Sequence, residues 1–385
     1  MSSMEFLEKL LDGVAIDWLP LGEITKYEQP TKYLVAAKNY SDEFETPVLT
    51  AGKTFILGYT NESEGIYKAS ENPVIIFDDF TTANKWVDFD FKAKSSAMKM
   101  ITSSDETKVL LKYIYYWLNT LPSELVDGDH KRQWISTFAE KRIPIPCPDN
   151  PKKSLEIQAE IVRILDAFTE LTAELTAELT ARKQQYKHYR NQLLSFEDGE
   201  VEWKPLGELA ENLDSKRKPI TSGLREIGDI PYYGASGIVD YVKDHIFDGD
   251  FLLVSEDGAN LLARKTPIAF SVSGKSWVNN HAHVLKFDTY AERRYVEYYL
   301  NSIDLTPYIS GAAQPKLNKK NLESISIPNP SPEEKKRIVA ILDKFDALTT
   351  SITEGLPREI ELRQKQYEHY RNLLLSFLKS EEITT

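Results

Sequence analysis

The sequence predicts an α+β protein with a pseudo-two-fold internal repeat, in which two mixed α/β domains are joined by two long helices that form an antiparallel coiled coil. Matching segments recur along the chain, two of them carry helical heptads, and short apolar runs alternate with turn residues between them. The 385 residues exceed one ordinary core and fit two domains. We divide the chain into a first mixed domain at 1–150, a helical region at 151–200, a second mixed domain at 201–330 and a second helical region at 331–385.

The repeat consists of three ordered pairs of segments. WLPLGEI at 18–24 returns as WKPLGEL at 203–209, IVRILDAF at 161–168 as IVAILDKF at 338–345, and RKQQYKHYRNQLLSF at 182–196 as RQKQYEHYRNLLLSF at 363–377. Their nearly constant offsets of 185, 177 and 181 residues indicate duplication of one unit. A shorter echo relates Ser95–Met98 to Asn280–His283.

The two copies have diverged unevenly. The helical segments are nearly identical, whereas 25–145 and 210–325 differ widely. A duplication without functional meaning is the alternative, and it does not account for this contrast. A repeated scaffold with two different surfaces suits a protein that recognises two different targets at a fixed distance.

Each mixed domain shows the same order of expected elements. Short apolar runs such as 73–77 and 251–254, bounded by Gly, Asp and Asn, predict strands and turns. One helix is expected at 107–119, with its equivalent at 291–301. Each domain ends in a proline-rich exit, at Ile143–Pro148 and Ile327–Pro330, where proline stops regular structure.

A long helix is expected after each exit. Ser331 is the expected N-cap of the second helix, with Pro332 and Glu334 completing a capping box, and Ser154 is the expected cap of the first. Apolar residues at heptad spacing line both helices, so each helix is the natural partner of the other. The first helix, of about 42 residues, would span roughly 60 Å. The second is expected to break at Gly355–Pro357.

The composition limits the class of protein. Cys147 is the only cysteine, which excludes an internal disulfide and four-cysteine zinc sites and suits a reducing cytoplasm. We see no signal peptide and no apolar run long enough for a membrane, so we expect a cytoplasmic protein. The net charge of −12 is spread along the chain, so a nucleic-acid-binding face would be a local basic patch on an acidic protein.

The sequence contains no recognisable catalytic motif. It lacks a P-loop, a Rossmann fingerprint, the Asn/Asp-Pro-Pro-aromatic tetrapeptide of amino-methyltransferases and HExxH, so we expect no catalytic residue, cofactor or metal on this chain. His281 and His283 alternate on an expected strand; metal ligation is the alternative, and hydrogen bonding within the domain is the favoured interpretation. The pairs Asp78-Asp79 and Glu256-Asp257 end matching strands; a nuclease centre is the alternative, and turn capping is the favoured interpretation.

Basic side chains form clusters with aromatic and amide groups in both mixed domains. Arg and Lys suit guanine edges and phosphates, and Gln and Asn suit adenine edges, although basic clusters are often ordinary solvated surface. The candidate DNA-binding residues are Lys85, Trp86, Lys131, Arg132 and Gln133 in the first domain, and Lys216, Arg217, Arg264, Lys265, Lys275, Gln314 and Lys316 in the second.

The whole chain resembles the DNA specificity subunits of type I restriction–modification systems. The resemblance is carried by the paired Trp-x-Pro-Leu-Gly-Glu segments at Trp18 and Trp203, the paired Gln-Tyr-x-x-Tyr-Arg helix ends such as Gln185–Phe196, the Asn279–His283 strand and Gly311–Lys316. Tandem Leu-Thr-Ala-Glu copies at 171–178 look like the subfamily with tetrapeptide repeats in its central helix. The first half departs from the pattern, with Ser95–Met98 and Gly128–Gln133 in place of the two later motifs.

This resemblance implies two target-recognition domains that each read one half of a split, asymmetric double-stranded DNA site. It implies a complex with two modification (methyltransferase) subunits and, for cleavage, two ATP-driven restriction subunits. Adenine methylation or cleavage would be carried out by those partners, which would bind S-adenosylmethionine, ATP and Mg. The chain itself would be non-catalytic, with no bound cofactor and no membrane partner.

Two other classes of function remain open on the sequence. A stand-alone adenine methyltransferase or nuclease would need a cofactor motif that the sequence lacks. A coiled-coil scaffold that binds only proteins would leave the divergence of the two mixed domains unexplained.

Overall fold

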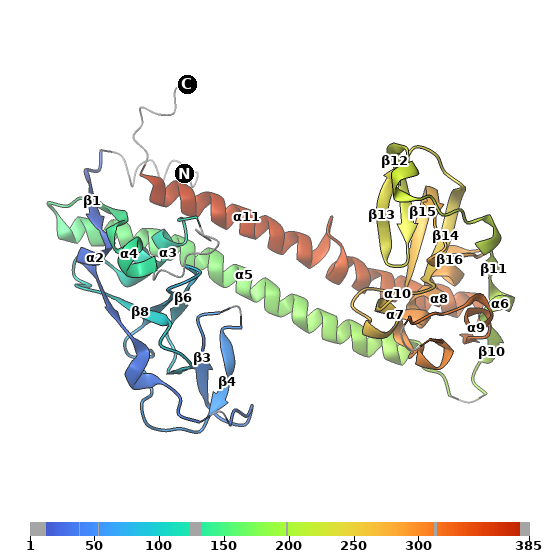
Figure 1. Cartoon of the computed structure of the whole chain (residues 1–385), viewed down its shortest axis with the longest axis horizontal. Helices are drawn as coiled ribbons and strands as arrows, with labels where there is room; N and C mark the ends of the chain where they lie inside the picture. The colour runs from blue at the N-terminus through green and yellow to red at the C-terminus, as the bar shows by residue number, and fades with distance from the viewer. Residues whose placement is uncertain are drawn as a thin grey trace. The chain divides into compact units, whose positions relative to one another are not determined.

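The computed structural model describes residues 13–37, 39–52, 54–122, 133–197, 199–311 and 314–377. It combines helices and sheets in a repeated arrangement, which confirms the expected fold class. The chain forms two compact units: unit 1 comprises Met1–Glu174 and Ile360–Thr385, and unit 2 comprises Leu175–Glu359 (Figure 1). Each unit thus holds one mixed domain with parts of the long helices, and the four-segment division of the sequence stays a prediction.

The mixed domain of unit 1 contains nine strands and several short helices among its described residues. The strands are β1 (Ile16–Pro20), β2 (Thr25–Glu28), β3 (Thr46–Leu49), β4 (Ile56–Thr60), β5 (Val74–Asp78), β6 (Asn84–Val87), β7 (Lys92–Ala93), β8 (Met98–Ser103) and β9 (Arg142–Pro146). The helices are α2 (Leu21–Ile24), η1 (Pro30–Tyr33), α3 (Leu111–Leu118), α4 (Gln133–Ser136) and η2 (Phe138–Glu140). The main sheet has the order β2-β8-β5-β6, and α3, which confirms the helix expected near 107–119, packs on β5 and β6.

The mixed domain of unit 2 has a similar set of elements. Its strands are β10 (Glu202–Pro205), β11 (Glu211–Asn212), β12 (Ile227–Gly234), β13 (Gly237–Val242), β14 (Phe247–Ser255), β15 (Ala269–Val278), β16 (Ala282–Lys286) and β17 (Ser326–Asn329). Its helices are α6 (Leu206–Leu209), η3 (Asp214–Lys216), η4 (Ser222–Leu224), α7 (Asn260–Ala263), α8 (Tyr290–Ser302), η5 (Thr306–Tyr308) and α9 (Lys319–Glu323). The main sheet has the order β11-β16-β14-β15-β12-β13, and α8 confirms the helix expected at 291–301.

The two units repeat one core. The order β2-β8-β5-β6 in unit 1 corresponds to β11-β16-β14-β15 in unit 2. The Trp-x-Pro-Leu-Gly-Glu segment closes each domain, because Leu21 and Leu206 are buried and their N–H groups donate to the carbonyl oxygens of Lys141 and Ile325, each at 2.9 Å. The repeated motif therefore serves the scaffold that both domains share.

Three long helices carry the repeated heptads: α5 (Pro151–Leu193), α10 (Pro332–Thr350) and α11 (Gly355–Ser376). α5 is continuous over 43 residues, as the sequence predicts. The break in the second helical region lies between Thr350 and Gly355, so Gly355–Pro357 begin α11 instead of interrupting a helix. Gly355 has a φ of 76°, which favours glycine at this start.

The helix caps confirm one expectation and correct another. The Ser331 hydroxyl accepts a hydrogen bond from the Glu334 N–H at 3.2 Å, as expected. Ser154 is not the cap of α5, since it lies buried inside the helix, while the Asn150 side chain accepts from the Lys153 N–H at 3.2 Å. Asn is as effective an N-cap as Ser, and the following Pro151 suits the first helical position.

The same aromatic contacts hold the helices together in both units. In unit 1, Phe168 of α5 stacks on Tyr370 of α11, with ring centroids 5.4 Å apart. In unit 2, Phe345 of α10 stacks on Tyr186 and Tyr189 of α5, at 6.0 and 5.7 Å. The start of α5 thus packs against α11 and its end against α10. Most residues of the expected apolar stripes become half-buried in these contacts, whereas Ile352 is exposed.

Candidate nucleic-acid interface

Equivalent strand ends position the polar groups of the two domains. In unit 1, Asp78 at the end of β5 lies opposite Met98 at the start of β8. In unit 2, Ser255 at the end of β14 lies opposite Ala282 at the start of β16. The residues that follow these four positions therefore also correspond between the units.

This register corrects the short echo expected from the sequence. Met98 corresponds to Ala282, and Lys99 corresponds to His283, so the match between Ser95–Met98 and Asn280–His283 is displaced by one residue. Strand register follows the burial of alternate side chains, and identity over four residues does not determine it. Lys99 and His283, both fully buried, are the equivalent polar residues.

Four polar side chains of unit 2 form a buried cluster behind the strand ends: Asp214, Arg217, Glu256 and His283. The His283 ring Nδ1 lies 2.6 Å from Asp214 Oδ2, and its Nε2 lies 2.7 Å from the Leu317 carbonyl oxygen. Arg217 Nη1 lies 2.6 Å from Glu256 Oε2, and its Nη2 lies 3.3 Å from Asp214 Oδ2. The interpretation of His283 as a histidine hydrogen-bonded within the domain is confirmed.

This cluster has the composition of a metal site but the charge balance of an ion-pair network. Asp214, Glu256 and His283 each place a ligand atom within 4.8 Å of the others, an approach that their spacing in the sequence does not reveal. Arg217 and Lys316, whose Nζ lies 3.1 Å from Glu256 Oε1, already neutralise the two carboxylates. The cluster therefore favours a structural network of paired charges.

Three loops meet in front of the cluster. The N–H of Glu256 donates to the His281 carbonyl oxygen at 2.9 Å. The N–H of Leu317 donates to the Glu256 carbonyl oxygen at 2.8 Å. The N–H of Gly258 donates to the Pro315 carbonyl oxygen at 3.1 Å. These backbone bonds fix the loops at one end of the sheet.

The loops present exposed polar side chains at this end. Lys316 and His281 each have 51% of the side chain exposed, and Gln314, two residues before Lys316, is exposed as well. The His281 ring Nδ1 lies 2.9 Å from both carboxylate oxygens of Asp257. Gln314 and Lys316 were expected from the sequence. Asp257 and His281 were selected in the sequence for other roles, and their place beside Lys316 was not expected, because it depends on the pairing of β14 with β16.

The other expected residues of the second domain divide between the two ends of the sheet. Lys216 is exposed in η3, directly before the buried cluster residue Arg217. Lys275 lies opposite Asp248 near the start of β14, eight residues before Glu256, which places it about 26 Å along the strand from Glu256 at roughly 3.3 Å per residue. Lys275 therefore does not share a surface patch with Lys316.

Arg264 has a structural contact, and Lys265 beside it is exposed. The Arg264 Nη2 donates to the carbonyl oxygens of Leu300, Asn301 and Ile303 at the C-terminal end of α8, with distances of 3.4, 3.3 and 2.8 Å. A guanidinium at this place satisfies carbonyl groups that the helix leaves open. Contact of Arg264 and Lys265 with DNA stays a prediction.

Unit 1 has a simpler buried pair at the equivalent place. The Lys99 side chain is 0% exposed and its Nζ lies 3.5 Å from Asp79 Oδ2. The Asp79 carbonyl oxygen accepts from the Gln133 N–H at 2.9 Å. In unit 2, the Glu256 carbonyl oxygen accepts from the Leu317 N–H in the same way. Gln133 is buried and corresponds to Leu317. Lys131 and Arg132 lie outside the described residues, and in the sequence Arg132 precedes Gln133 as Lys316 precedes Leu317.

The remaining sequence-selected groups of unit 1 lie on strands β5 and β6. Asp78 accepts from the Phe80 N–H at 3.0 Å and from the Thr81 hydroxyl at 2.8 Å, so turn capping is confirmed for Asp78. Asp79 accepts instead from the Trp134 N–H at 2.9 Å, and Glu256 and Asp257 contact Arg217 and His281, so these three side chains bond to residues distant in the sequence. Lys85 is exposed on β6. The Trp86 ring is half-buried against α3, with the Lys112 Nζ 5.2 Å from its centroid.

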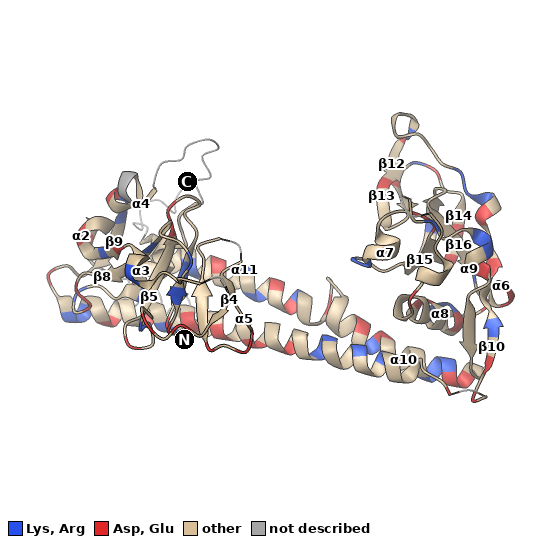
Figure 2. Ribbon diagram, turned by 60° about the horizontal axis from the view of Figure 1, so that its bottom comes forward, with Lys and Arg blue, Asp and Glu red and all other residues tan. Residues whose placement is uncertain are grey.

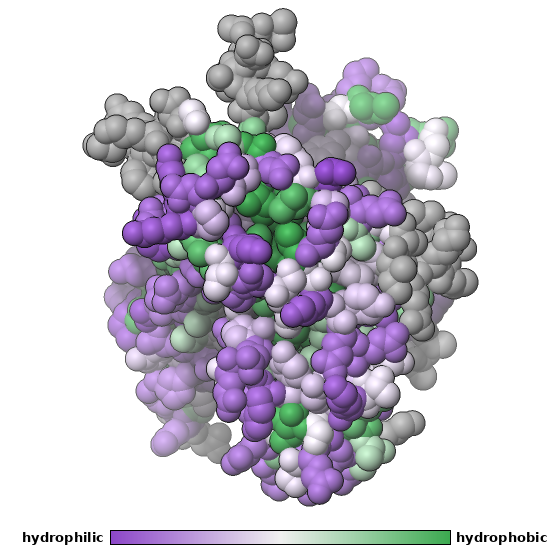
Figure 3. Space-filling view, turned by 90° about the vertical axis from the view of Figure 1, so that its left-hand side faces the viewer, coloured by the Kyte–Doolittle hydropathy of each residue, from purple (hydrophilic) through white to green (hydrophobic). Residues whose placement is uncertain are grey.

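Residues of both charge signs are interspersed along the described chain. Lys and Arg alternate with Asp and Glu along the helices and over both domains (Figure 2). On the face in Figure 3, hydrophilic residues predominate, and apolar residues show mainly in the upper part, with a few near the lower edge.

Acid should destabilise the unit 2 domain through this cluster. Burial raises the pKa of Asp214 and of Glu256, but hydrogen bonds from His283 to Asp214 and from Arg217 and Lys316 to Glu256 outweigh it, so both pKa values lie below their ordinary ones. Groups with a depressed pKa contribute stability above the unfolded-state pKa, and this contribution is lost as pH falls through the folded pKa, here below about pH 4.

We therefore expect Glu256→Gln to lower the free energy of unfolding at pH 7 by about 1–3 kcal/mol, with the difference from wild type shrinking below about pH 4. Thermal unfolding as a function of pH measures both effects. Asp229→Asn, at an exposed position of β12, is the control and should leave the profile unchanged. A difference for Glu256→Gln that is constant from pH 3 to pH 7 contradicts the assignment.

Comparison with known proteins identifies the family. A model of the type I restriction modification DNA specificity domain matches the chain twice, at residues 17–182 and 199–362. The chain belongs to this family. The EcoR124I/EcoR124II specificity subunit of Escherichia coli is 56% identical over 414 aligned residues, covering 100% of both chains. The EcoprrI specificity subunit of Escherichia coli is 34% identical and covers 92% of this chain and 93% of the relative.

Solved structures share the fold. The S subunit of a type I restriction-modification system from M. genitalium has a TM-score of 0.64 at 16% identity, covering 95% of this chain and 96% of that one. A chain from a study of complex assembly in a type I R-M system has a TM-score of 0.54 at 14% identity, covering 94% and 97%. As a type I specificity subunit, the chain is a non-catalytic protein of DNA sequence recognition. Within the described ranges, no helix has the length and apolar character needed to cross a membrane.

Proposed function

We propose that this specificity subunit reads a bipartite, asymmetric DNA site, with each mixed domain reading one half. The observation that carries the proposal is the repeated core, β2-β8-β5-β6 and β11-β16-β14-β15, on which the sequences of 25–145 and 210–325 have diverged. One scaffold with two different surfaces is suited to two different half-sites. The double match of the family model supports the same division.

We further propose that partner subunits carry out the chemistry. Two modification subunits would bind S-adenosylmethionine and methylate adenine, and two restriction subunits would use ATP and Mg for cleavage, so this chain would act in the cytoplasm without a cofactor of its own. The net charge of −12 supports this division of labour, because an acidic chain needs partners to supply much of the phosphate contact.

In unit 2, we place the DNA-reading surface on the loops at the end of β14. Lys316 and Gln314 are exposed there beside His281 and Asp257, and Lys216 precedes the cluster that supports the loops. Lys suits phosphate or guanine, and an amide suits adenine. Arg217 would support this surface from behind, through its ion pairs with Asp214 and Glu256.

Replacing Lys316 with Ala should weaken DNA binding by the assembled complex. Loss of a phosphate contact lowers affinity across sequences and flattens the salt dependence by about one unit, whereas loss of a base contact relaxes specificity at one position by about 1–3 kcal/mol. Fluorescence anisotropy at several salt concentrations, with cognate and altered duplexes, separates the two results. Lys344→Ala, at an exposed position of α10, is the matched control. Unchanged affinity, salt slope and site preference for Lys316→Ala would place this surface off the DNA.

A further inference from the structure

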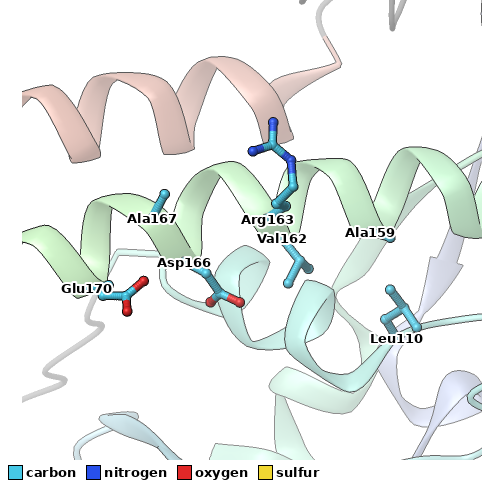
Figure 4. Close-up of a pocket in the computed structure, with 7 residues that line it drawn as sticks. All are labelled: Leu110, Ala159, Val162, Arg163, Asp166, Ala167 and Glu170. Carbon is cyan, nitrogen blue, oxygen red and sulfur yellow. The ribbon is translucent and has the colours of Figure 1, made fainter.

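A three-residue polar contact ties α3 to α5 in unit 1. The Tyr116 hydroxyl donates to Asp166 Oδ1 at 2.5 Å, and Lys112 Nζ lies 2.9 Å from the same oxygen. Tyr116 and Lys112 are one turn apart on α3, so both face Asp166. Figure 4 shows Asp166 directed from α5 toward the neighbouring helix, at a shallow depression between Leu110 and Glu170.

The same contact ties α8 to α10 in unit 2. The Tyr298 hydroxyl donates to Asp343 Oδ1 at 2.6 Å, and Arg294 Nε lies 3.1 Å from that oxygen. Arg294 also pairs with Asp346 at 2.9 Å and with Glu297 at 2.6 Å, and it contacts the Tyr298 hydroxyl. Unit 2 therefore has a denser version of the contact.

The two contacts occupy equivalent positions in the repeat. Asp166 and Asp343 are the same residue of the pair IVRILDAF and IVAILDKF. Lys112 and Tyr116 stand in α3 where Arg294 and Tyr298 stand in α8, with an offset of 182 residues. α3 and α8 lie inside the segments that otherwise diverged, so a basic residue, a tyrosine and an aspartate have stayed together in both copies. We call each set a latch.

The latches fix the orientation of each domain helix on the long helix, which the apolar contacts around them do not. In unit 1, Tyr113 and Ile114 of α3 share a core with Ile161 and Leu165 of α5, and such burial is non-directional. A hydrogen bond weakens steeply away from its preferred angle. Burial and the bond to Asp166 raise the pKa of Tyr116, and burial and the bond to Asp343 raise that of Tyr298, so both hydroxyls stay protonated donors.

We propose that Lys112, Tyr116 and Asp166, and their counterparts Arg294, Tyr298 and Asp343, are positioning residues that set the angle of each recognition domain on its helix. This inference rests on the proposed function. A domain of this size is roughly 30 Å across, so a rotation of about 10° moves its far edge by about 5 Å. That displacement exceeds the rise of one base pair, roughly 3.4 Å. The latches would thereby determine which spacer length the two domains accept.

The test measures spacer preference in the complete complex with modification subunits. Duplexes carry both half-sites with the native spacer or with one base pair more or fewer. We expect Tyr116→Phe and Tyr298→Phe each to reduce the preference for the native spacer by roughly threefold to tenfold, without changing the preferred half-site bases. Lys112→Arg, which installs the residue of the other copy, should retain the preference. Glu174→Gln removes an exposed carboxylate from the same helix as Asp166 and should also retain it.

A merely stabilising contact would lower DNA affinity equally for every spacer, or lower only the melting temperature. Either result for the Phe variants would contradict the positioning role of the latches. Melting temperatures of all variants are recorded with the binding data. If one Phe variant does not fold, its counterpart in the other unit decides the question. The proposed function itself would be overturned if the wild-type complex bound no DNA sequence selectively. A negative result for the Phe variants would overturn only the role of the latches.

Discussion

Removing Thr176–Leu179 from α5 is expected to shorten the spacer of the recognised DNA site by about one or two base pairs and to leave both half-site sequences unchanged. Four residues of α-helix correspond to roughly 6 Å and to about 40° beyond a whole turn. The deletion removes one copy of the tandem tetrapeptide, which lies where the two compact units meet in the sequence. α5 runs through the repeat without a break, so the deletion changes the length of a helix and not of a loop.

The alternative is that the repeat is a tolerated feature of a solvated helix. Glu174, Thr176, Ala177 and Glu178 are exposed, in agreement with a solvated face. Leu171, Leu175 and Leu179 are half-buried and mark the packed side of the helix. A change in the length of α5 would displace these packed residues. Methylation mapping of the deletion variant distinguishes the two, with Thr176→Ala as a control that keeps the length. Full activity at an unchanged spacer would refute the role of the repeat.

Exchanging residues 210–325 for the same segment of another family member should change one half-site completely and leave the other half-site intact. The segment contains β11 to β16 and α8, the divergent part of unit 2, whereas unit 1 has its own sheet and core. Loss of correct base contacts at about 1–3 kcal/mol each removes binding to the original half-site. The donor segment should keep a basic residue and a tyrosine at the positions of Arg294 and Tyr298, so that it docks on Asp343.

Methylation mapping of the exchange variant reports both half-sites at once. Exchanging 25–145 is the matched experiment, and it should change the other half-site. If either exchange alters both half-sites, the two domains do not read DNA independently.

Local patterns in the sequence predicted the elements whose formation depends on neighbouring residues. The continuous α5, the Ser331 cap and the helices α3 and α8 follow from periodicity and capping, which act over a few residues. The cap of α5 was misplaced because Asn150 and Ser154 are both suitable residues, and burial of Ser154 excludes it.

Contacts between distant residues could not be predicted in the same way. His283 meets Asp214 across 69 residues, and Tyr116 meets Asp166 across 50. A signal for the latches was nevertheless present in the sequence. Both repeated helix segments place an aspartate directly after Ile-Leu, and both domain helices carry a basic residue four positions before a tyrosine. No comparable signal indicated that Arg217 pairs with buried carboxylates or that Arg264 binds the end of α8, because basic residues look alike in sequence whether they are exposed or paired.

The most direct test of the central claim is methylation mapping of a genome in cells that carry this chain together with its modification subunits. We predict methylated adenine in a single motif of two specified parts, separated by a constant number of unspecified base pairs. Methylation should vanish when either this chain or the modification subunits are omitted. A continuous motif, a motif with one specified part, or methylation by this chain without the modification subunits would contradict the account.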